Sequence, residues 1–287
     1  MKNSFDFHVH STASDGSLSP SDVVRKAAAD QVTVVALTDH DTTEGVKEFV
    51  EAGKECGITA IGGVEISIDY PGTMHMCGYF VDVDNDELRS GLQFVQEARL
   101  NRNPMIVEKL NAAGVDITME EIVKVAGGGQ VGRPHFAEVM VRKGFVSNTK
   151  EAFTKYMAKG KPCYVDKKRL GLKEAVAMIR SAGGIAVLAH PGELRLNGQG
   201  EYEEIFKRIK DEGVEGLESY SSHHTDEQNA QFRELADKFD LFSTAGSDFH
   251  GDTKPHVQLG VFGEQVEVDV SSLIETMNWI RTERCKL

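Results

Sequence analysis

The chain has 287 residues, with 45 acidic and 32 basic side chains and a formal charge of -13 at pH 7. This acidic balance argues against a protein that coats long nucleic acid or an anionic membrane. No apolar stretch approaches the length of a membrane span, and Cys56, Cys77, Cys163 and Cys285 are too scattered for a disulfide framework, so we expect a cytoplasmic protein.

Short β-type runs alternate with amphipathic stretches along most of the chain, a pattern typical of βα units around a parallel sheet or barrel. Ser19 and Pro20 suit the start of a first helix, and Thr43 and Gly57 suit the start and end of a second. Seven strands are predicted, at Phe5–Val9, Val32–Leu37, Thr59–Ile66, Met74–Phe80, Ile185–Ala189, Val214–Glu218 and Leu241–Thr244.

A helical segment interrupts this alternation. Four helical patterns follow one another between Arg99 and Lys161, and each ends at a glycine. We therefore predict a discontinuous barrel domain of residues 1–98 and 164–287 and a small helical insertion of residues 99–163. From Arg99 to Lys173 there are 15 basic and 7 acidic residues, so the acidic chain carries a basic insertion that can attract a small phosphorylated substrate.

Histidines and carboxylates recur where the predicted strands end. A single histidine at such a place is more often packed or hydrogen-bonded than a metal ligand. The joint occurrence of many is different, because sites of βα barrels are assembled at the carboxyl ends of the strands. The residues concerned, expected at the carboxyl ends of successive parallel strands, are His8, His10, Asp15, His40, Glu65, His75, His190, Asp248 and His250.

Nine imidazole and carboxylate ligands exceed the needs of one tetrahedral ion and suit two or three divalent ions with open positions for water and substrate. The absence of thiolate ligands points to manganese, iron or zinc. Glu65, with two carboxylate oxygens, is a natural bridge between adjacent ions. Such ligand sharing is typical of multinuclear hydrolytic sites.

The motifs HVHSTASDG, LTDHD, GVEIS, MHMCGY, VLAHP and SDFH resemble, in order, those of the PHP (polymerase and histidinol phosphatase) family. The resemblance covers almost the whole chain. It implies an α/β fold, a distorted seven-stranded (β/α) barrel similar to a TIM barrel, with a trinuclear metal site and phosphoesterase activity. Asp15 and the helical insertion resemble the subgroup that acts on AMP-like nucleotides and 3′,5′-nucleoside bisphosphates such as pAp.

The resemblance also implies how the ligands group. His8, His10, Glu65 and Asp248 would hold one ion; Glu65, His75 and His190 a second; and Asp15, His40 and His250 a third. Glu65, His190, Asp248 and His250 are the expected catalytic residues. A water activated by two cations would attack phosphorus in line, while the ions neutralise charge on the phosphoryl oxygens and the leaving group.

Substrate contacts are expected from the insertion, where guanidinium groups match phosphate oxygens in a bidentate geometry. The candidates there are Arg99, Arg102, Arg133 and His135, although Arg99 and Arg102 can also be read as solvated helix charges. Arg195 and His223 are further candidates in the barrel domain. The expected partner is a small phosphorylated nucleotide, with very short oligonucleotides as an extension, and neither long nucleic acid nor a membrane.

Other functions remain open from sequence. The chain could be a PHP phosphoesterase of another specificity, such as a histidinol-phosphatase-like enzyme or an exonuclease on short oligoribonucleotides. It could also be a catalytically silent PHP interaction module, although loss of activity would erase ligands first and all nine positions keep ligand-type side chains. Barrel hydrolases of C–N bonds share the HxH opening, but the AHP and SDFH motifs fit the PHP pattern better.

Overall fold

A computed structural model describes residues 3–127, 131–166, 168–264 and 266–284. The chain divides into two compact units, unit 1 with Met1–Gly91 and Leu170–Leu287 and unit 2 with Leu92–Arg169. The sequence-based boundaries of the insertion lie several residues inside unit 2. One long helix, α3 (Asp86–Ala112), runs through the first boundary, and it continues past Pro104.

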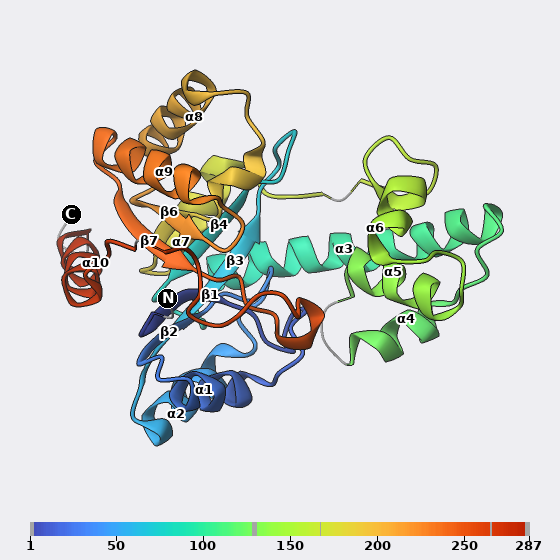
Figure 1. The fold of residues 1–287 in the computed structure, drawn as a ribbon, viewed down its shortest axis with the longest axis horizontal. Helices are drawn as coiled ribbons and strands as arrows, with labels where there is room; N and C mark the ends of the chain where they lie inside the picture. Colours follow the sequence, from blue (N-terminus) through green and yellow to red (C-terminus); the bar gives the residue numbers. More distant parts are fainter. Residues whose placement is uncertain (1–2, 128–130, 167, 265, 285–287) are drawn as a thin grey trace. The chain divides into compact units, whose positions relative to one another are not determined.

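Unit 1 is built on one seven-stranded sheet in which the strands follow their chain order, nearly closed into a barrel (Figure 1). Hydrogen bonds between the end of β1 and the segment after β7 bring the two edge strands together, with His10 N–H donating to Phe249 O at 2.8 Å. The strands are β1 Phe5–Val9, β2 Val34–Leu37, β3 Thr59–Ser67, β4 His75–Tyr79, β5 Ile185–Leu188, β6 Gly216–Ser221 and β7 Phe242–Gly246. The predicted fold class is confirmed.

The direction of β4 corrects one expectation. We predicted that all ligand-bearing strands are parallel, but β4 pairs antiparallel with both β3 and β5, and Ser67 is opposite His75. Its first residue, His75, therefore lies at the same edge of the sheet as the carboxyl ends of the parallel strands. The expected position of His75 is correct, although it begins its strand instead of ending it.

Helices cover the outside of the sheet. In Figure 1, α1 and α2 lie together beside β1–β3, and α9 lies along β6. Val24 of α1 and Phe49 of α2 pack on Val35 and Leu37 of β2 in one apolar cluster. The bounds in unit 1 are α1 Pro20–Ala29, α2 Val46–Cys56, α7 Leu172–Ser181, α8 Gln199–Asp211, α9 Asp226–Lys238 and α10 Val270–Arg284, with short helices η2 Pro191–Leu194 and η3 Gly251–Thr253.

The barrel interior has an apolar half. Phe5, Phe7 and Tyr79 are buried there, and Leu273 and Met277 of α10 pack against the same cluster. Burying such side chains stabilises the fold by roughly 1.5–3 kcal/mol each. Since this cluster fills the half where β1 begins, the polar residues gather where β1 ends.

Unit 2 is helical. Besides most of α3 it contains α4 Met119–Ala126, α5 Arg133–Arg142, α6 Thr149–Ala152 and the π-helical turn η1 Phe153–Met157. Thr118 caps α4 in a capping box with Glu121. Ile106, Ile122 and Phe136 belong to its separate apolar core. In the described part of the chain, no helix is both long enough and apolar enough to cross a bilayer.

Candidate metal centre

The end of β1 supplies the first two members of a buried polar cluster. His8 and His10 are two residues apart in an extended chain, so their side chains point to the same side. Both are completely buried, and their Nε2 atoms lie 3.1 Å apart. Glu65 Oε2 is 3.3 Å from each of these nitrogens, and Asp248 Oδ1 is 3.1 Å from that of His10 and 3.7 Å from that of His8.

These four atoms have the spacing of ligands around one ion. Nitrogen and oxygen ligands about 2.0–2.2 Å from a tetrahedral ion lie roughly 3.3–3.6 Å from one another. A second observation agrees: His40 Nδ1 and Glu65 Oε2 are 2.8 Å apart, yet neither buried atom makes a hydrogen bond within the described residues. A cation between them would satisfy both atoms, and the donor set fits a shared divalent ion.

Glu65 lies at the centre of the cluster. Its Oε1 is 2.8 Å from His75 Nδ1 and 2.9 Å from His190 Nε2, while its Oε2 faces His8, His10 and His40. The two oxygens therefore serve different neighbours. This geometry suits the bridging role expected from the sequence.

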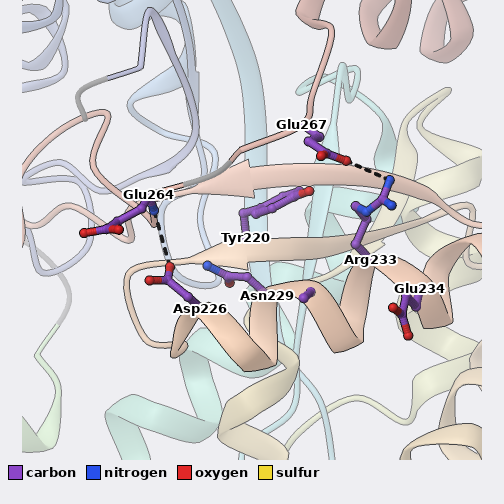
Figure 2. A pocket seen from close by; sticks show the side chains of 8 residues that line it. Tyr220, Asp226, Asn229, Arg233, Glu234, Glu264 and Glu267 are labelled. Atoms are coloured by element: carbon purple, nitrogen blue, oxygen red, sulfur yellow. Dashed lines mark hydrogen bonds and ion pairs between the residues drawn. The ribbon is translucent and has the colours of Figure 1, made fainter.

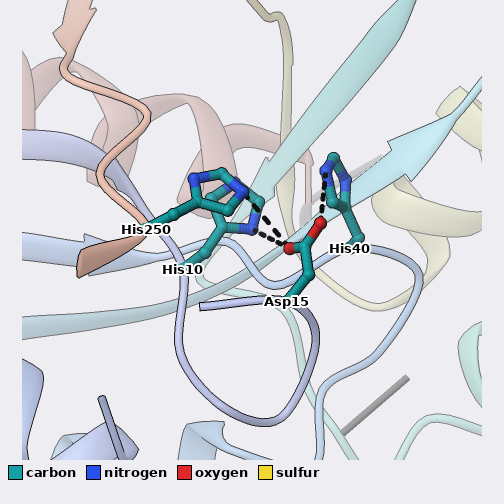
Figure 3. A group of neighbouring side chains, drawn as sticks. All are labelled: His10, Asp15, His40 and His250. Atoms are coloured by element: carbon teal, nitrogen blue, oxygen red, sulfur yellow. Dashed lines mark ion pairs between the residues drawn. The ribbon is translucent and has the colours of Figure 1, made fainter. Parts of the chain in front are cut away.

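A second group forms around Asp15 (Figure 3). Asp15 Oδ1 is 3.2 Å from His250 Nε2 and 3.8 Å from His10 Nδ1, and Asp15 Oδ2 is 4.0 Å from His40 Nε2. His10 thus presents one nitrogen to each group. All nine residues singled out from the sequence come together here, with His10 as an additional member of the Asp15 group and His40, Glu65 and His75 as a further close set.

The electrostatics of the cluster favour cations. Burial alone would raise carboxyl pKa values, but His40 and His75 hold the pKa of Glu65, and Lys254 that of Asp248, well below the usual range. Burial opposes protonation of His10, yet Asp248 and Glu65 raise its pKa to about 9. Burial lowers the pKa of His75 to about 4. The carboxylates are thus anionic at neutral pH, and some imidazoles hold protons that a metal ion can displace.

The comparisons with known proteins decide the family. The PHP domain matches residues 6–219, more than half of the chain. The chain belongs to the PHP family.

Two similar curated relatives match most of the chain. A 5′-3′ exoribonuclease of Haemophilus influenzae is 38% identical over 87% of this chain and 91% of its own length. A 3′,5′-nucleoside bisphosphate phosphatase of Chromobacterium violaceum is 36% identical over 85% and 86%.

Two solved structures have a similar fold. A Chromobacterium violaceum protein described as an amidohydrolase, with bound sulfate and no metal, superposes with a TM-score of 0.86, 33% identity and 96% coverage of both chains. A metal-dependent phosphoesterase of Bifidobacterium adolescentis gives a TM-score of 0.83, 29% identity and 94% coverage of both. The protein is therefore a hydrolase of phosphate esters, which confirms the predicted enzyme class.

Two residues that contact the ligand candidates were not predicted from the sequence. Lys254 Nζ pairs with Asp248 Oδ2, and the same oxygen is 2.6 Å from His223 Nε2. His223, a predicted substrate contact, therefore lies beside a ligand candidate. Glu218 of β6 is completely buried and contacts His8. Lys254 and Glu218 lie outside the family motifs, and the one signal for Glu218 was its place as the last residue of the predicted strand Val214–Glu218.

The carboxylate of Asp39, which is not one of the ligand candidates, stabilises the turn that carries Asp15. Asp39 accepts hydrogen bonds from Ser11 N–H at 2.8 Å, Ser11 Oγ at 2.6 Å and Ser14 Oγ at 2.5 Å. All of these groups are buried, so the carboxylate replaces water as their partner. Asp39 thus orients its neighbours and fixes the loop from which Asp15 enters the cluster.

Arginines gather within unit 2. Burial lowers the pKa of Arg102 to about 9, with Arg99, Arg133 and Arg169 adding repulsion. Arg102 is 6% exposed, and its Nε makes no hydrogen bond within the described residues. Arg133 lies over the rings of Phe153 and Tyr164, at 5.7 and 5.8 Å. Cationic side chains packed this closely favour a bound anion.

The other two candidates have different surroundings. His135 is buried, and its Nδ1 accepts the Gly132 N–H at 3.0 Å, which caps the start of α5. This bond gives His135 a structural role in stabilising the first turn of α5. The side chain of Arg195 is 80% exposed and forms an ion pair with Glu193 at 3.4 Å.

A separate cavity of about 330 Å³ lies along α9 in unit 1 (Figure 2). Arg233 pairs there with Glu267 at 3.0 Å, and Glu264 N–H donates to Asp226 Oδ1 at 3.3 Å. None of the nine ligand candidates lines this cavity. The convergent geometry of the metal centre is not repeated there.

Proposed function

We propose that the protein is a metal-dependent phosphatase of small nucleotides, with 3′,5′-nucleoside bisphosphates such as pAp, or AMP, as substrates. The observation that carries the proposal is the convergence of six imidazoles and three carboxylates at one edge of the barrel. The Chromobacterium violaceum relative, named a 3′,5′-nucleoside bisphosphate phosphatase, supports the substrate class.

The residues present fit two or three divalent ions. We assign His8, His10, Glu65 and Asp248 to one position, Glu65, His75 and His190 to a second, and Asp15, His40 and His250 to a third. Manganese, iron or zinc suits this set because it lacks thiolates. Such ions, when bound, supply an activated water and neutralise charge on the phosphoryl group.

The chain itself supplies order around these ligands. Asp248 has a left-handed backbone conformation, with φ 56°, and its outer oxygen is held by His223 and Lys254. These two contacts fix the rotamer in which Oδ1 faces His10. We propose that the cationic Lys254 also attracts the anionic substrate toward the centre.

We propose that the arginine cluster of unit 2 is itself a phosphate-binding site. Arg99, Arg102 and Arg133 provide donors for a phosphate group. Arg102 also lines a cavity of about 440 Å³ with Phe94 and Met105, which are 45% and 50% exposed. Apolar and aromatic walls of this kind accept nucleobases by stacking. A nucleotide with a second phosphate would use both features.

A second candidate function is exonuclease activity on short oligoribonucleotides. It is favoured by the Haemophilus influenzae relative, which is 38% identical and is named a 5′-3′ exoribonuclease. Both activities hydrolyse a phosphate ester, which is a monoester for the phosphatase and a diester for the exonuclease. The cytoplasmic location stays a prediction, supported by the unpaired Cys56, Cys77 and Cys163, while Cys285 lies outside the described residues.

The test is a panel assayed with metal-loaded protein: pAp, AMP, histidinol phosphate and a 5′-phosphorylated trinucleotide. We expect the highest kcat/KM for pAp or AMP. Preference for the trinucleotide would establish the second candidate. Preference for histidinol phosphate would refute the nucleotide specificity and leave the phosphatase activity standing.

A further inference from the structure

We propose that Glu218 is a positioning residue of the metal centre, which fixes the nitrogen that His8 presents to the cluster and anchors the backbone of His190. The inference rests on the proposed metal-dependent function. No sequence motif marks Glu218, which lies in the middle of β6, yet its side chain is completely buried beside two ligand candidates.

The first contact concerns the ring of His8. Glu218 Oε2 is 2.8 Å from His8 Nδ1, on the side of the ring opposite to the Nε2 that faces His10 and Glu65. An ionised carboxylate accepts hydrogen bonds and has no proton to donate. The Nδ1 atom must therefore carry the proton, and the lone pair of a neutral His8 is left on Nε2, where a metal ion can bind.

The second contact concerns the chain at His190. The same Oε2 accepts the His190 N–H at 3.1 Å. His190 has φ 25° and ψ 65°, a left-handed conformation that non-glycine residues rarely adopt. The side chain of His190 reaches Glu65 only from this bend at the end of β5, with Nε2 2.9 Å from Oε1. One carboxylate thus orients ligand candidates from two different strands.

The neighbouring backbone leaves space for this pair. A Cβ atom at Gly246 of β7 would lie 2.3 Å from His8 Cβ and 3.1 Å from Glu218 Oε1. Any larger residue would displace His8 or Glu218, so glycine is required there. Cys77 Sγ also lies near the inner nitrogen, at 3.9 Å. Sulfur is only a weak hydrogen-bond acceptor, so this thiol cannot replace the carboxylate.

Glu215, the residue immediately before β6, provides a matched control. Its Oε2 accepts the Ala186 N–H of β5 at 2.9 Å, just as Glu218 accepts that of His190. It pairs with Arg284 at 3.4 Å and Arg180 at 3.7 Å, and no ion pair among the described residues joins it to a histidine. Glu215→Gln therefore perturbs a comparable carboxylate–backbone bond between β6 and β5 without reaching the cluster.

The test measures Mn²⁺ binding to the metal-stripped full chain by calorimetry, for wild type, Glu218→Gln, Glu218→Ala and Glu215→Gln. Removing a carboxylate that orients a ligand weakens metal binding by about 10- to 100-fold. We expect that loss for Glu218→Ala at the two positions to which His8 and His190 belong, a smaller loss for Glu218→Gln, whose amide oxygen still accepts hydrogen bonds, and wild-type affinity for Glu215→Gln. Unchanged affinity in Glu218→Ala, or an equal loss in Glu215→Gln, would overturn the proposal.

A second measurement does not depend on the variants. In the Zn²⁺-loaded wild type, long-range ¹H–¹⁵N NMR spectra report which nitrogen of His8 carries a proton. We expect the proton on Nδ1; a proton on Nε2, or a metal ion bound to Nδ1 with Cys77, would overturn the proposal. If wild type binds Mn²⁺ and Glu218→Ala weakens it but no phosphate ester is hydrolysed, the proposed function fails while the role of Glu218 stands.

Discussion

Replacing Glu65 by glutamine would separate the charge of this side chain from its shape. The substitution keeps the length and volume of the residue and replaces one carboxylate oxygen by an amide NH₂. Because Oε1 faces His75 and His190 while Oε2 faces His8, His10 and His40, either orientation of the amide turns an NH₂ group toward imidazole nitrogens. At least one proposed metal position then loses its shared oxygen.

The size of the effect follows from burial. Glu65 is completely inaccessible to solvent, so water cannot replace the lost charge. Removing one partner from a buried, paired charge costs about 3–5 kcal/mol. At 1.4 kcal/mol per factor of ten, metal affinity should fall by roughly 100- to 4,000-fold. Glu65 also neutralises protonated imidazoles in the metal-free protein, so the variant should lose stability as well.

The assay compares metal-stripped wild type, Glu65→Gln and the control Glu215→Gln. Metal equivalents are counted by mass spectrometry after gel filtration, affinity is measured by calorimetry, and circular dichroism verifies the fold. We expect Glu65→Gln to lose more than one equivalent and Glu215→Gln to keep all of them. A folded Glu65→Gln protein with wild-type stoichiometry and affinity would refute the bridging role.

Three further predictions concern unit 2, protons and metal removal. Arg133→Ala should raise KM for pAp by about 10- to 100-fold, the value of a lost charge-assisted hydrogen bond, with unchanged metal content; equal loss of metal would contradict its role. Because the pKa of His10 is raised to about 9, metal binding at neutral pH must displace its proton. Metal affinity should therefore rise with pH up to about 9, and calorimetry in buffers of different ionisation enthalpy should detect proton release; its absence would argue against His10 as a ligand. Chelation should lower Tm by several degrees, since ligands at 100-fold excess over Kd stabilise by about 2.7 kcal/mol; an unchanged Tm would show that the native fold binds no metal.

The sequence predicted the strands well because local signals mark them. β1 was predicted over its observed range, and His8 and His10 share a face because of the two-residue period of a strand. The antiparallel direction of β4 was missed, although the signal was present. Only residues 68–74 separate β3 from β4, whereas a parallel crossover needs a dozen residues or more.

The supporting residues could not be predicted, for a different reason. Glu218 is 210 positions from His8, and only the closure of the sheet brings the two together. Lys254 reaches Asp248 from a short helical turn whose direction the sequence does not encode locally. The continuity of α3 through Pro104 was likewise hidden, because proline normally ends a helical pattern.

The most direct test of the account is phosphate release from pAp by the metal-stripped protein as Mn²⁺ is added. The account predicts no release without metal and activity that rises with bound metal to saturation at two or three equivalents. Saturation at one equivalent would contradict the multinuclear site. A folded, fully loaded protein that released no phosphate from pAp or AMP would contradict the proposed nucleotide phosphatase function itself.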